Sequence, residues 1–510
     1  MKEQRLYALK KMKRLSLAVL FFCLTIPAAL LSQTGEVSPS PTLSPTQVEA
    51  IETFVQQQMT AGKIPGMSVV IVMGDRTVYE RGFGFADMER KEKVTPQTLF
   101  ELGSCSKAFT GLAVLQLEEK GVLQPSDPVT KYIPWLKLKF QGQEVPVTIA
   151  QFLHQTSGIP FKSIAAIPEA AGDDALERTV RTLLDTELIH QPGQKFHYAT
   201  INYDVLGLVI REVSGLSYEE YIKKNILDPL RMNNTYLFKE DGQAAGMAAG
   251  YKLSFKKQAA YDAPVYRGNT PAGYIMTNAG DLARWLKIQM GTGEPGMISP
   301  ELIEKSHITD PALESSIYAA GWFVLKNQGL TSHSGGNPNF AAYIGFGTEK
   351  VGVAVLINTG VAFATGTGQG ILAILRGGEP RPSFPDMNTR FDSIASLIVL
   401  VFGILAFLAL VLLIIIIIKI ITKKRKFAIK GTKKAVGFIV ATALLVVLVY
   451  VISIIPSLLG YDVPLSFGFV WLPFSFTYAV FALFLTVILY YLFFLSVLFF
   501  PKQGGGAPSR

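Results

Sequence analysis

A serine and a lysine three residues apart are the residues of this chain best suited to acyl transfer. Ser104 and Lys107 lie in the segment Gly-Ser-Cys-Ser-Lys at 103–107, which leads into a predicted helix at 112–120. On a helix this spacing puts both side chains on one face. A serine hydroxyl becomes an effective nucleophile when a neighbouring base takes its proton, and a partly desolvated lysine can be that base. A helix-capping serine beside a solvated lysine would show the same spacing, so other segments must decide.

Two later segments complete a recognisable set. Residues 196–207 read Phe-His-Tyr-Ala-Thr-Ile-Asn-Tyr-Asp-Val-Leu-Gly, and residues 333–340 read His-Ser-Gly-Gly-Asn-Pro-Asn-Phe between two predicted strands. In this order the three segments resemble the Ser-x-x-Lys, Tyr-x-Asn and Lys/His-x-Gly motifs of the class C serine β-lactamases, the related D-alanyl-D-alanine peptidases and esterases, and peptidase family S12. Smaller stretches agree, such as His-Gln-Thr-Ser-Gly at 154–158 and Gly-Trp at 321–322. The resemblance covers about the whole of residues 48–376.

The resemblance implies both a fold and a mechanism. The fold would be β-lactamase-like, of α/β (α+β) class, and Ser104 would attack a carbonyl to form an acyl-enzyme. Lys107 and Tyr198 would share the proton transfers. The backbone N–H groups of Ser104 and Gly336 would form the oxyanion hole. Gly335 and Ser334, in the same motif, would bind substrate.

Two positions depart from the family pattern. Thr200 stands where asparagine completes the second motif, so the amide that usually holds the acylamide carbonyl of a β-lactam is missing. His333 stands where many relatives have lysine, which removes a permanent cation beside the scissile bond. We therefore expect inefficient β-lactam hydrolysis and a substrate cleaved at an internal amide.

A narrower resemblance concerns the substrate. The same segments, followed by three apolar runs, are similar to the membrane-anchored prodrug-activating D-asparaginyl peptidases of nonribosomal-peptide pathways, such as the colibactin, xenocoumacin and zwittermicin maturation peptidases. This implies removal of an N-acyl-D-asparagine cap from an exported peptide prodrug. Asn337 and Asn339 are candidates to bind the D-asparagine side chain, because an amide offers one donor group and one acceptor. Alternatively, they only cap a turn next to Pro338.

The elements expected around these residues predict one sheet closed by both ends of the domain. A helix is predicted at 48–61, and the middle of the domain, 104–288, reads as mostly helical. Strands are predicted at 67–73, 77–85, 319–325, 341–346 and 351–358. This order indicates an antiparallel sheet flanked by helices, with an inserted all-helical subdomain and a cleft between the two.

Both ends of the chain have the composition of export and membrane segments. Residues 1–32 have a basic start, an apolar stretch and small residues, which is typical of a signal peptide, and a Ser/Pro-rich spacer follows at 33–47. The hydrolase domain at 48–376 is followed by a linker at 377–392. Apolar runs at 393–421, 435–459 and 473–500 are each long enough to cross a hydrocarbon core of about 30 Å as a transmembrane helix.

The charges of the connecting loops predict the topology. The loop at 422–434 is rich in lysine and should be cytoplasmic, whereas the loop at 460–472 has no basic residue and should lie outside. The tail at 501–510 would be cytoplasmic. The chain is therefore predicted to be a multi-pass protein of the cytoplasmic membrane with an extracytoplasmic catalytic domain. The lipid bilayer is an expected partner, and an export pump is a further candidate partner.

Composition argues against several other functions. The net charge is +9, but much of the excess lies in one short loop and the signal peptide, so no nucleic-acid partner is expected. The five histidines lack metal-ligand spacing, and neither a metal nor another cofactor is expected. Cys105 is the cysteine left after signal cleavage, so a monomer has no disulfide.

Several alternative functions share the same catalytic residues. The closest alternatives are a D,D-carboxypeptidase or low-activity penicillin-binding protein acting on peptidoglycan, and an esterase. An alternative of another class is a β-lactam-sensing membrane receptor, in which Ser104 is acylated slowly without turnover. Its weakness is the shortness of 422–434 and 501–510, which cannot fold into an output domain.

Overall fold

The computed structural model describes residues 42–294, 296, 298–381, 386–454 and 463–502. The expected signal peptide and residues 33–41 of the expected spacer lie outside this range. The chain divides into two compact units. The larger comprises residues 33–252 and 257–389, and the smaller contains residues 390–510 together with 253–256.

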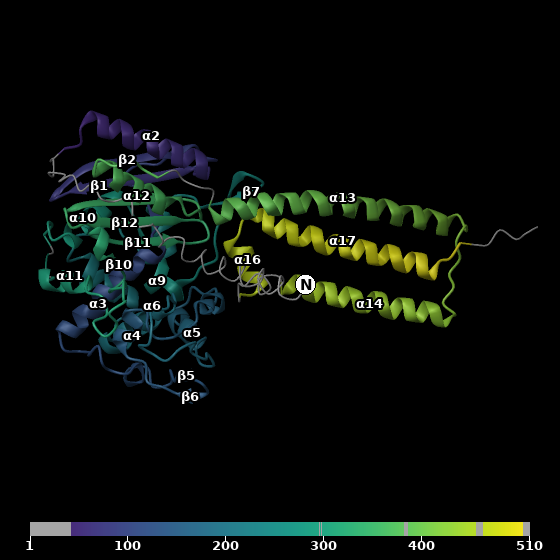
Figure 1. Cartoon of the computed structure of the whole chain (residues 1–510), viewed down its shortest axis with the longest axis horizontal. Coiled ribbons are helices and arrows are strands. Elements are labelled where there is room, and N and C mark those ends of the chain that lie inside the picture. The colour runs from purple at the N-terminus through teal and green to yellow at the C-terminus, as the bar shows by residue number, and fades with distance from the viewer. Residues whose placement is uncertain (1–41, 295, 297, 382–385, 455–462, 503–510) are drawn as a thin grey trace, which may run out of the picture. The chain divides into compact units, whose positions relative to one another are not determined.

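The larger unit is built on a seven-stranded antiparallel sheet (Figure 1). Its order is β10-β11-β12-β13-β1-β2-β3, and β1 pairs with β13, so that Met67 faces Ile357. The sheet is therefore closed by both ends of the domain, as the sequence predicts. The strands are β1 (Gly66–Met73), β2 (Arg76–Asp87), β3 (Glu92–Lys93), β10 (Phe323–Leu325), β11 (Leu330–Gly336), β12 (Ala341–Gly347) and β13 (Val351–Ile357).

Helices cover both faces of this sheet. The central strands β1, β12 and β13 are buried along their whole length, which explains their nearly continuous apolar sequences. Gly352 faces α10 (Ala279–Gln289), whereas Tyr343 packs against α12 (Phe363–Leu375) on the other face. Helix α2 (Pro45–Gly62) packs against α12 and begins three residues before the expected position, because Ser44 and Gln47 form a capping box.

The remaining elements lie between β3 and β10 in the sequence and are mostly helical. The helices are η2 (Gly103–Ser106), α3 (Lys107–Glu119), η3 (Val129–Lys131), α4 (Ile149–Leu153), η4 (Phe161–Ala166), α5 (Ala175–Arg181), α6 (Asn202–Ser214), α7 (Tyr218–Ile222), η5 (Lys223–Leu227), α8 (Lys239–Ala244), η6 (Arg267–Asn269), α9 (Thr270–Gly273) and α11 (Pro300–Ser306), with η7 (Lys326–Gln328) after β10. Three small antiparallel pairs join them: β4 (Phe100–Glu101) with β9 (Met276–Thr277), β5 (Lys139–Phe140) with β6 (Gln143–Glu144), and β7 (Tyr251–Ser254) with β8 (Lys257–Ala260).

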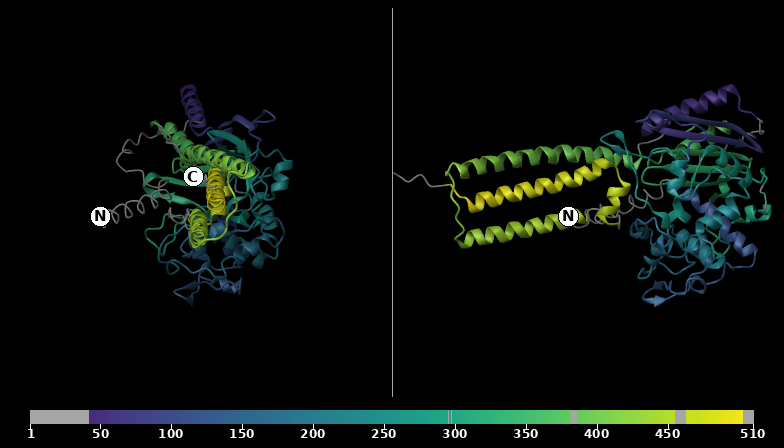
Figure 2. Two further views of the ribbon diagram at one scale, coloured as in Figure 1. Left: turned by 90° about the vertical axis from the view of Figure 1, so that its right-hand side faces the viewer. Right: turned by 180° about the vertical axis from the view of Figure 1, so that it is seen from behind.

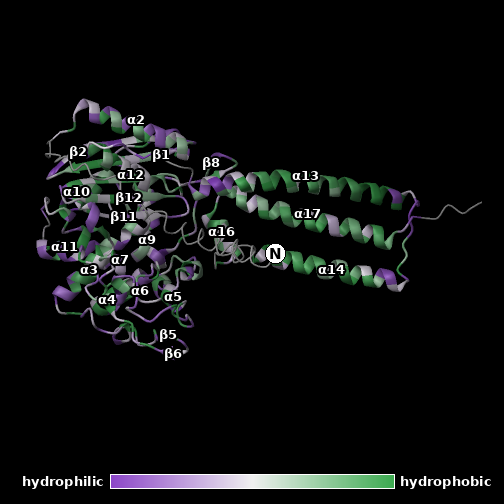
Figure 3. Cartoon of the chain, in the orientation of Figure 1, coloured by the Kyte–Doolittle hydropathy of each residue, from purple (hydrophilic) through white to green (hydrophobic). Residues whose placement is uncertain are grey.

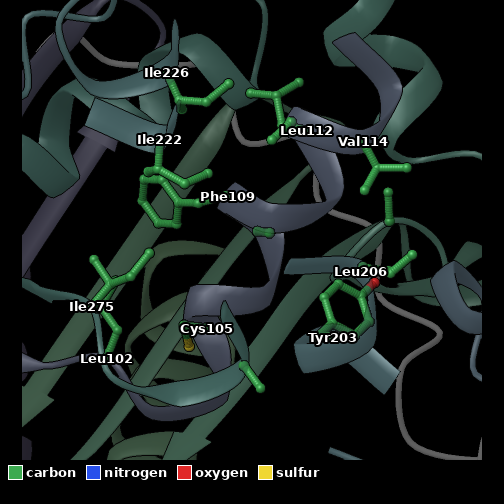
Figure 4. Packing of buried hydrophobic residues seen from close by; sticks show 14 of the residues in the cluster. Leu102, Cys105, Phe109, Leu112, Val114, Tyr203, Leu206, Ile222, Ile226 and Ile275 are labelled. Carbon is green, nitrogen blue, oxygen red and sulfur yellow. The ribbon is translucent and has the colours of Figure 1, made fainter. Parts of the chain in front are cut away.

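Helix α3 runs through the core of the unit. It is buried from Lys107 to Leu117, so both of its faces pack on other elements rather than on solvent. Phe109 stacks on Trp285 with ring centroids 4.1 Å apart. Figure 4 shows Cys105 of η2 and Phe109 of α3 among Tyr203, Leu206 and Ile275, which come from distant parts of the sequence. This burial fixes the first turn of α3 rigidly, and Lys107 lies in that turn.

One strand differs from the expectation. The sequence predicts that the segment 333–336 lies between two strands, but in the structure it forms the second half of β11. Residues 319–322 are not part of a strand, and β10 begins at Phe323. The sequence pattern does not predict this strand because its last two residues are glycines, and glycine is depleted in strands.

The smaller unit contains three long apolar helices. They are α13 (Met387–Ile421), α14 (Thr432–Ser453) and α17 (Phe474–Phe499), and each is long and apolar enough to cross a membrane. Figure 3 shows hydrophobic residues along nearly the whole of each helix, and Figure 2 shows the three running alongside one another. Thr486 Oγ1 donates to the Phe402 carbonyl at 2.9 Å, which ties α17 to α13.

The boundaries of these helices differ from the predicted spans by a few residues. Helix α13 begins at Met387, so the last six residues assigned to the linker are helical. A short helix, α16 (Leu465–Trp471), lies in the expected outer loop. The last residues of the second predicted span, 455–459, lie outside the described residues.

Candidate active site

Ser104 is placed by the junction of β4 and β9. The Leu102 N–H donates to the Ile275 carbonyl at 2.8 Å, and the chain then turns at Gly103 into the short helix η2. Gly103 has φ +52°, and a Cβ added there would lie 2.4 Å from the Gly336 nitrogen. Only glycine allows this close approach. Ser104 is partly exposed, so its hydroxyl can reach a substrate.

Lys107 is fully buried beside this hydroxyl. Its Nζ lies 3.1 Å from Ser104 Oγ, 2.8 Å from Thr200 Oγ1 and 2.7 Å from the Ala272 carbonyl oxygen. A neutral amine has two N–H bonds and one lone pair. If the N–H bonds point to Thr200 and Ala272, the lone pair faces the Ser104 O–H. Three contacts therefore prepare Lys107 as the base that activates Ser104.

The protonation of Lys107 agrees with this role. Burial lowers its pKa from 10.5 to about 7, and the nearby Asp204 carboxyl partly opposes that effect. Near neutral pH, a large fraction of Lys107 is therefore free to accept a proton.

Tyr198 is held against the same residues by the segment 153–158. Gln155 Oε1 accepts the Ala199 N–H at 2.9 Å, and the Gln155 carbonyl accepts the His197 N–H at 2.8 Å, so Tyr198 is clamped between them. Its ring lies 5.3 Å from Lys107 Nζ, and its hydroxyl is shielded from solvent. Burial raises the pKa of Tyr198, although the Ser104 and Thr200 hydroxyls oppose the rise. Tyr198 is therefore a protonated phenol at neutral pH, ready to donate.

The end of β11 supplies the second oxyanion donor. The Asn337 N–H donates to the Phe340 carbonyl at 2.8 Å across the β11–β12 turn. Because N–H directions alternate along an antiparallel ladder, the Gly336 N–H points the other way, toward Ser104. A Cβ at Gly335 would lie 1.8 Å from the Leu102 carbonyl oxygen, so glycine is required there. The structure thus brings Gly335 and Gly336 against the segment that carries the nucleophile.

His333 and Ser334 precede these glycines and point to opposite faces of the sheet. His333 is 2 % exposed, and its ring centroid lies 6.2 Å from that of Tyr198. Burial lowers its pKa to about 3, and the Lys107 charge adds to the effect. His333 is therefore neutral at physiological pH. Ser334 Oγ accepts from Thr365 Oγ1 of α12 at 2.8 Å, which engages it away from Ser104.

Asn337 and Asn339 are both buried, and their amide nitrogens are occupied. Asn337 Nδ2 donates to Glu101 Oε2 at 2.6 Å and to the Gly273 carbonyl at 2.9 Å. Asn339 Nδ2 donates to the Tyr261 carbonyl at 2.9 Å, whereas its Oδ1 has no partner among the described residues. Asn339 therefore retains a buried acceptor, and Asn337 mainly joins β11 to β4.

Three residues that sequence reasoning did not single out belong to the site. Asp204 is fully buried on α6, four residues after Thr200, and burial raises its pKa well above the usual value. Glu101 is buried beneath Asn337, and Tyr318 contacts His333. An acidic residue inside an apolar helical run, as at Asp204, is a sequence signal for such a buried site residue. The partners of Tyr318 and Glu101 are too distant in the sequence to predict.

Comparisons with known proteins agree with this geometry. A family model described as Beta-lactamase matches residues 51–375. Protein flp of Staphylococcus aureus (strain MRSA252) is 34% identical over 317 residues, which is 61% of this chain and 62% of that protein. The putative penicillin-binding protein PbpX of Bacillus subtilis (strain 168) is 31% identical over 57% of this chain and 70% of its own length. The chain thus spans less than two thirds of the flp sequence.

A solved structure extends the comparison to three dimensions. The structure of the octameric penicillin-binding protein homologue from Pyrococcus abyssi superposes with a TM-score of 0.59 at 32% sequence identity. The match covers 68% of this chain and 81% of that one. The β-lactamase-like α/β fold expected from the sequence is thereby confirmed.

Proposed function

Since this chain belongs to the beta-lactamase family, we propose that it is a membrane-bound serine peptidase that removes an N-acyl-D-asparagine cap from an exported nonribosomal peptide or polyketide prodrug. Family membership makes it a serine hydrolase with an acyl-enzyme mechanism. The substrate is the proposed part. Such a reaction would mature an antibiotic or toxin outside the producing cell and so contribute to self-resistance.

The observation that carries the proposal is the neutral, buried imidazole of His333. A substrate with a free carboxylate beside the scissile bond needs a cation to compensate its charge. At the motif position where many relatives have lysine, this chain presents a neutral ring at physiological pH. An internal amide, in which a neutral group continues beyond the scissile bond, fits the part of the site beside His333 better than a terminal D-amino acid does.

The contacts around Ser104 define how an amide would be cleaved. Lys107 takes the Ser104 proton as Oγ attacks the carbonyl carbon, and the N–H groups of Ser104 and Gly336 stabilise the resulting oxyanion. Tyr198 donates a proton to the leaving nitrogen as the C–N bond breaks, and Lys107 returns a proton to Tyr198. Water then attacks the acyl-enzyme with the same two residues as base and acid, releasing the acylated residue.

Recognition of a D-asparagine side chain requires a donor group and an acceptor. Of the two asparagines, Asn339 is the one whose Oδ1 acceptor is buried without a partner among the described residues. We therefore assign the contact with the substrate amide N–H to Asn339. Asn337, whose Nδ2 is held by Glu101 and Gly273, keeps only its Oδ1 for substrate.

The apolar helices support a substrate that carries a fatty acyl chain. An acyl chain partitions into a bilayer by about 0.8 kcal/mol per buried CH₂, so an anchored enzyme would meet it at the interface. The lysines between α13 and α14 favour a cytoplasmic position for that loop and hence an extracytoplasmic catalytic domain. An export pump in the same membrane would deliver the prodrug.

A second candidate function has its own support. Two of the similar proteins are described as a putative penicillin-binding protein and a penicillin-binding protein homologue. A D,D-carboxypeptidase or low-activity penicillin-binding protein would use the same serine on peptidoglycan stem peptides. It would need to accept a terminal carboxylate, which the neutral His333 disfavours. An esterase or a β-lactam-sensing receptor would use the serine on other acyl groups.

The test compares three substrates on the full-length protein in detergent. They are an N-myristoyl-D-asparaginyl amide, its L-asparaginyl isomer and its D-alanyl counterpart, each with wild-type protein and with Ser104→Ala. We expect cleavage of the D-asparaginyl amide, little cleavage of the L isomer, and loss of activity in Ser104→Ala. Preference for the D-alanyl counterpart would contradict the proposal and favour cell-wall metabolism. Stable acylation by penicillin without turnover would favour the receptor.

A further inference from the structure

The imidazole of His333 is held at both nitrogens. Nδ1 lies 2.7 Å from the carbonyl oxygen of Ser334, and Nε2 lies 3.1 Å from the hydroxyl of Tyr318. Tyr318 lies just before β10 and is 0 % exposed. Both contacts are within hydrogen-bond distance. The ring therefore has no freedom to turn a nitrogen toward a substrate without breaking one of them.

The chemistry of the two partners decides which nitrogen carries the proton. A carbonyl oxygen only accepts, so Nδ1 must carry the hydrogen that points to Ser334. In a neutral imidazole, Nε2 then has a lone pair, and the Tyr318 O–H donates to it. The only other arrangement that satisfies Ser334 is an imidazolium, with hydrogens on both nitrogens.

The groups around His333 disfavour the imidazolium. Lys107 of α3 is the nearest cation, Tyr198 approaches from the loop before α6, and the Cys105 thiol donates to the His333 carbonyl at 3.2 Å. Phe323 of β10 packs on the ring with centroids 5.2 Å apart. Tyr318 and Tyr198 are phenols with raised pKa values, so neither supplies an anion to balance a charged ring at neutral pH.

We propose that Tyr318 is a positioning residue that contributes to substrate specificity, because its hydroxyl donates to Nε2 and, together with the Ser334 carbonyl at Nδ1, holds His333 in the neutral Nδ1–H tautomer, which disfavours substrates with a carboxylate beside the scissile bond. Tyr318 itself does not contact the reacting atoms. The inference deepens the proposed function and rests on it for the placement of the substrate, whereas the tautomer lock depends only on the contacts of His333.

The first experiment observes the tautomer directly. Full-length protein with ¹⁵N-labelled histidine is titrated in detergent micelles, and the His333 signals are assigned with a His333→Gln sample. In the wild type we expect the Nδ1–H tautomer, with no protonation down to pH 5. In Tyr318→Phe the neutral ring loses a donor at Nε2, so the pKa of His333 should rise above the wild-type value, while burial and the Lys107 charge still hold it below the ordinary value. An Nε2–H tautomer or an imidazolium in the wild type at pH 7 would overturn the inference.

The second experiment measures specificity as a ratio. We compare kcat/KM at pH 5.5 and pH 8 for two substrates that carry the same N-acyl-D-asparaginyl group. One is an amide, and the other is a dipeptide that ends in a free carboxylate. In Tyr318→Phe the ratio should shift severalfold toward the carboxylate at pH 5.5, where a larger fraction of His333 is charged than in the wild type, and little at pH 8. Protonation of the Lys107 base at low pH lowers kcat/KM for both substrates equally. It therefore does not change their ratio.

Tyr343→Phe is the matched control. Tyr343 is a buried tyrosine in the sheet that contains His333, but it packs against α12 on the face opposite to the His333 side chain. This variant also loses one tyrosine hydroxyl, but it should change neither the titration of His333 nor the ratio of the two kcat/KM values. An equal effect in both variants, or no effect in Tyr318→Phe, would overturn the inference. Failure of the wild type to cleave either substrate would contradict the proposed function, and the titration would still decide whether the lock exists.

Discussion

Asn337 Nδ2 donates to Glu101 Oε2 at 2.6 Å and so joins two residues that are 236 positions apart in the chain. The contact connects the turn after β11 to β4. Strand β11 carries the oxyanion donor, and β4 leads into the nucleophile. Both side chains are buried, and burial raises the pKa of Glu101 from 4.5 to about 7, although the Asn337 hydrogen bond opposes the rise. The alignment of the two halves of the site therefore depends on a titratable group.

Stability should decrease as Glu101 ionises. The folded protein holds this proton up to about pH 7, whereas the unfolded chain releases it near pH 4.5, so the contribution is fully present below pH 4.5 and is lost as the pH rises through 7. A pKa difference of this size corresponds to roughly 3 kcal/mol. In Glu101→Gln we expect a weaker dependence of thermal unfolding on pH and a higher melting temperature than wild type at pH 8. Parallel curves for the two proteins would contradict this.

The rate of acylation should follow the ionisation of Lys107. Its neutral form is the base, so kcat/KM should rise with pH and level off above about pH 7. Lys107→Arg should lower kcat/KM by about 10³-fold or more, since arginine stays protonated. Lys131→Arg, at an exposed lysine paired with Asp127, is the control and should leave activity unchanged. Retained activity in Lys107→Arg would exclude Lys107 as the base.

Thr200 should orient the base through its hydroxyl. Its Oγ1 accepts from Lys107 Nζ at 2.8 Å, so Thr200→Val removes an acceptor while nearly keeping the volume of the side chain. We expect kcat/KM to fall about tenfold to a hundredfold, as for a buried donor left without a partner. The loss of an acceptor also disfavours the ammonium form, so the midpoint of the pH profile should move to lower pH. Thr200→Ser keeps the oxygen and should retain most activity, and equal losses in both variants would contradict this role.

The two glycines at the end of β11 should differ sharply in their tolerance of a methyl group. A Cβ at Gly335 would lie 1.8 Å from the Leu102 carbonyl oxygen, whereas a Cβ at Gly336 would meet no atom within 4 Å. Gly335→Ala should therefore displace β11 from η2 and abolish acylation of Ser104 by a fluorophosphonate probe. Gly336→Ala should still be labelled by the same probe. Labelling of Gly335→Ala at the wild-type rate would show that the two segments do not pack as described.

Much of the fold was predictable because its signals are local. The strands β1, β12 and β13 are nearly uninterrupted apolar runs, and the three long helices are apolar along most of their length, so each follows from composition alone. Strand β11 was missed because Ser332 to Gly336 contain little apolar surface. Its place is determined by pairing with β12 rather than by intrinsic preference.

The candidate site was predictable only in part, for a related reason. Ser104, Lys107 and Tyr198 stand in short motifs, and the structure brings all three together. Thr200 appeared in the sequence as a missing asparagine, but its contact with Lys107 depends on how α6 packs against α3. The pairs Glu101 with Asn337 and Tyr318 with His333 depend on tertiary packing, which no spacing in the sequence reveals.

The order of strands in the sheet also determines how much of the chain must be synthesised before the sheet can be completed. Strand β1, near the start of the domain, lies between β2 and β13, and β13 ends at Ile357. A nascent chain that has reached Lys107 has its nucleophile and base but lacks β11 and the strands that hold it. The sheet that holds the site therefore cannot be complete until β13, which ends at Ile357, has been synthesised. The three long apolar helices, from Met387 to Phe499, are synthesised only after every residue of the site.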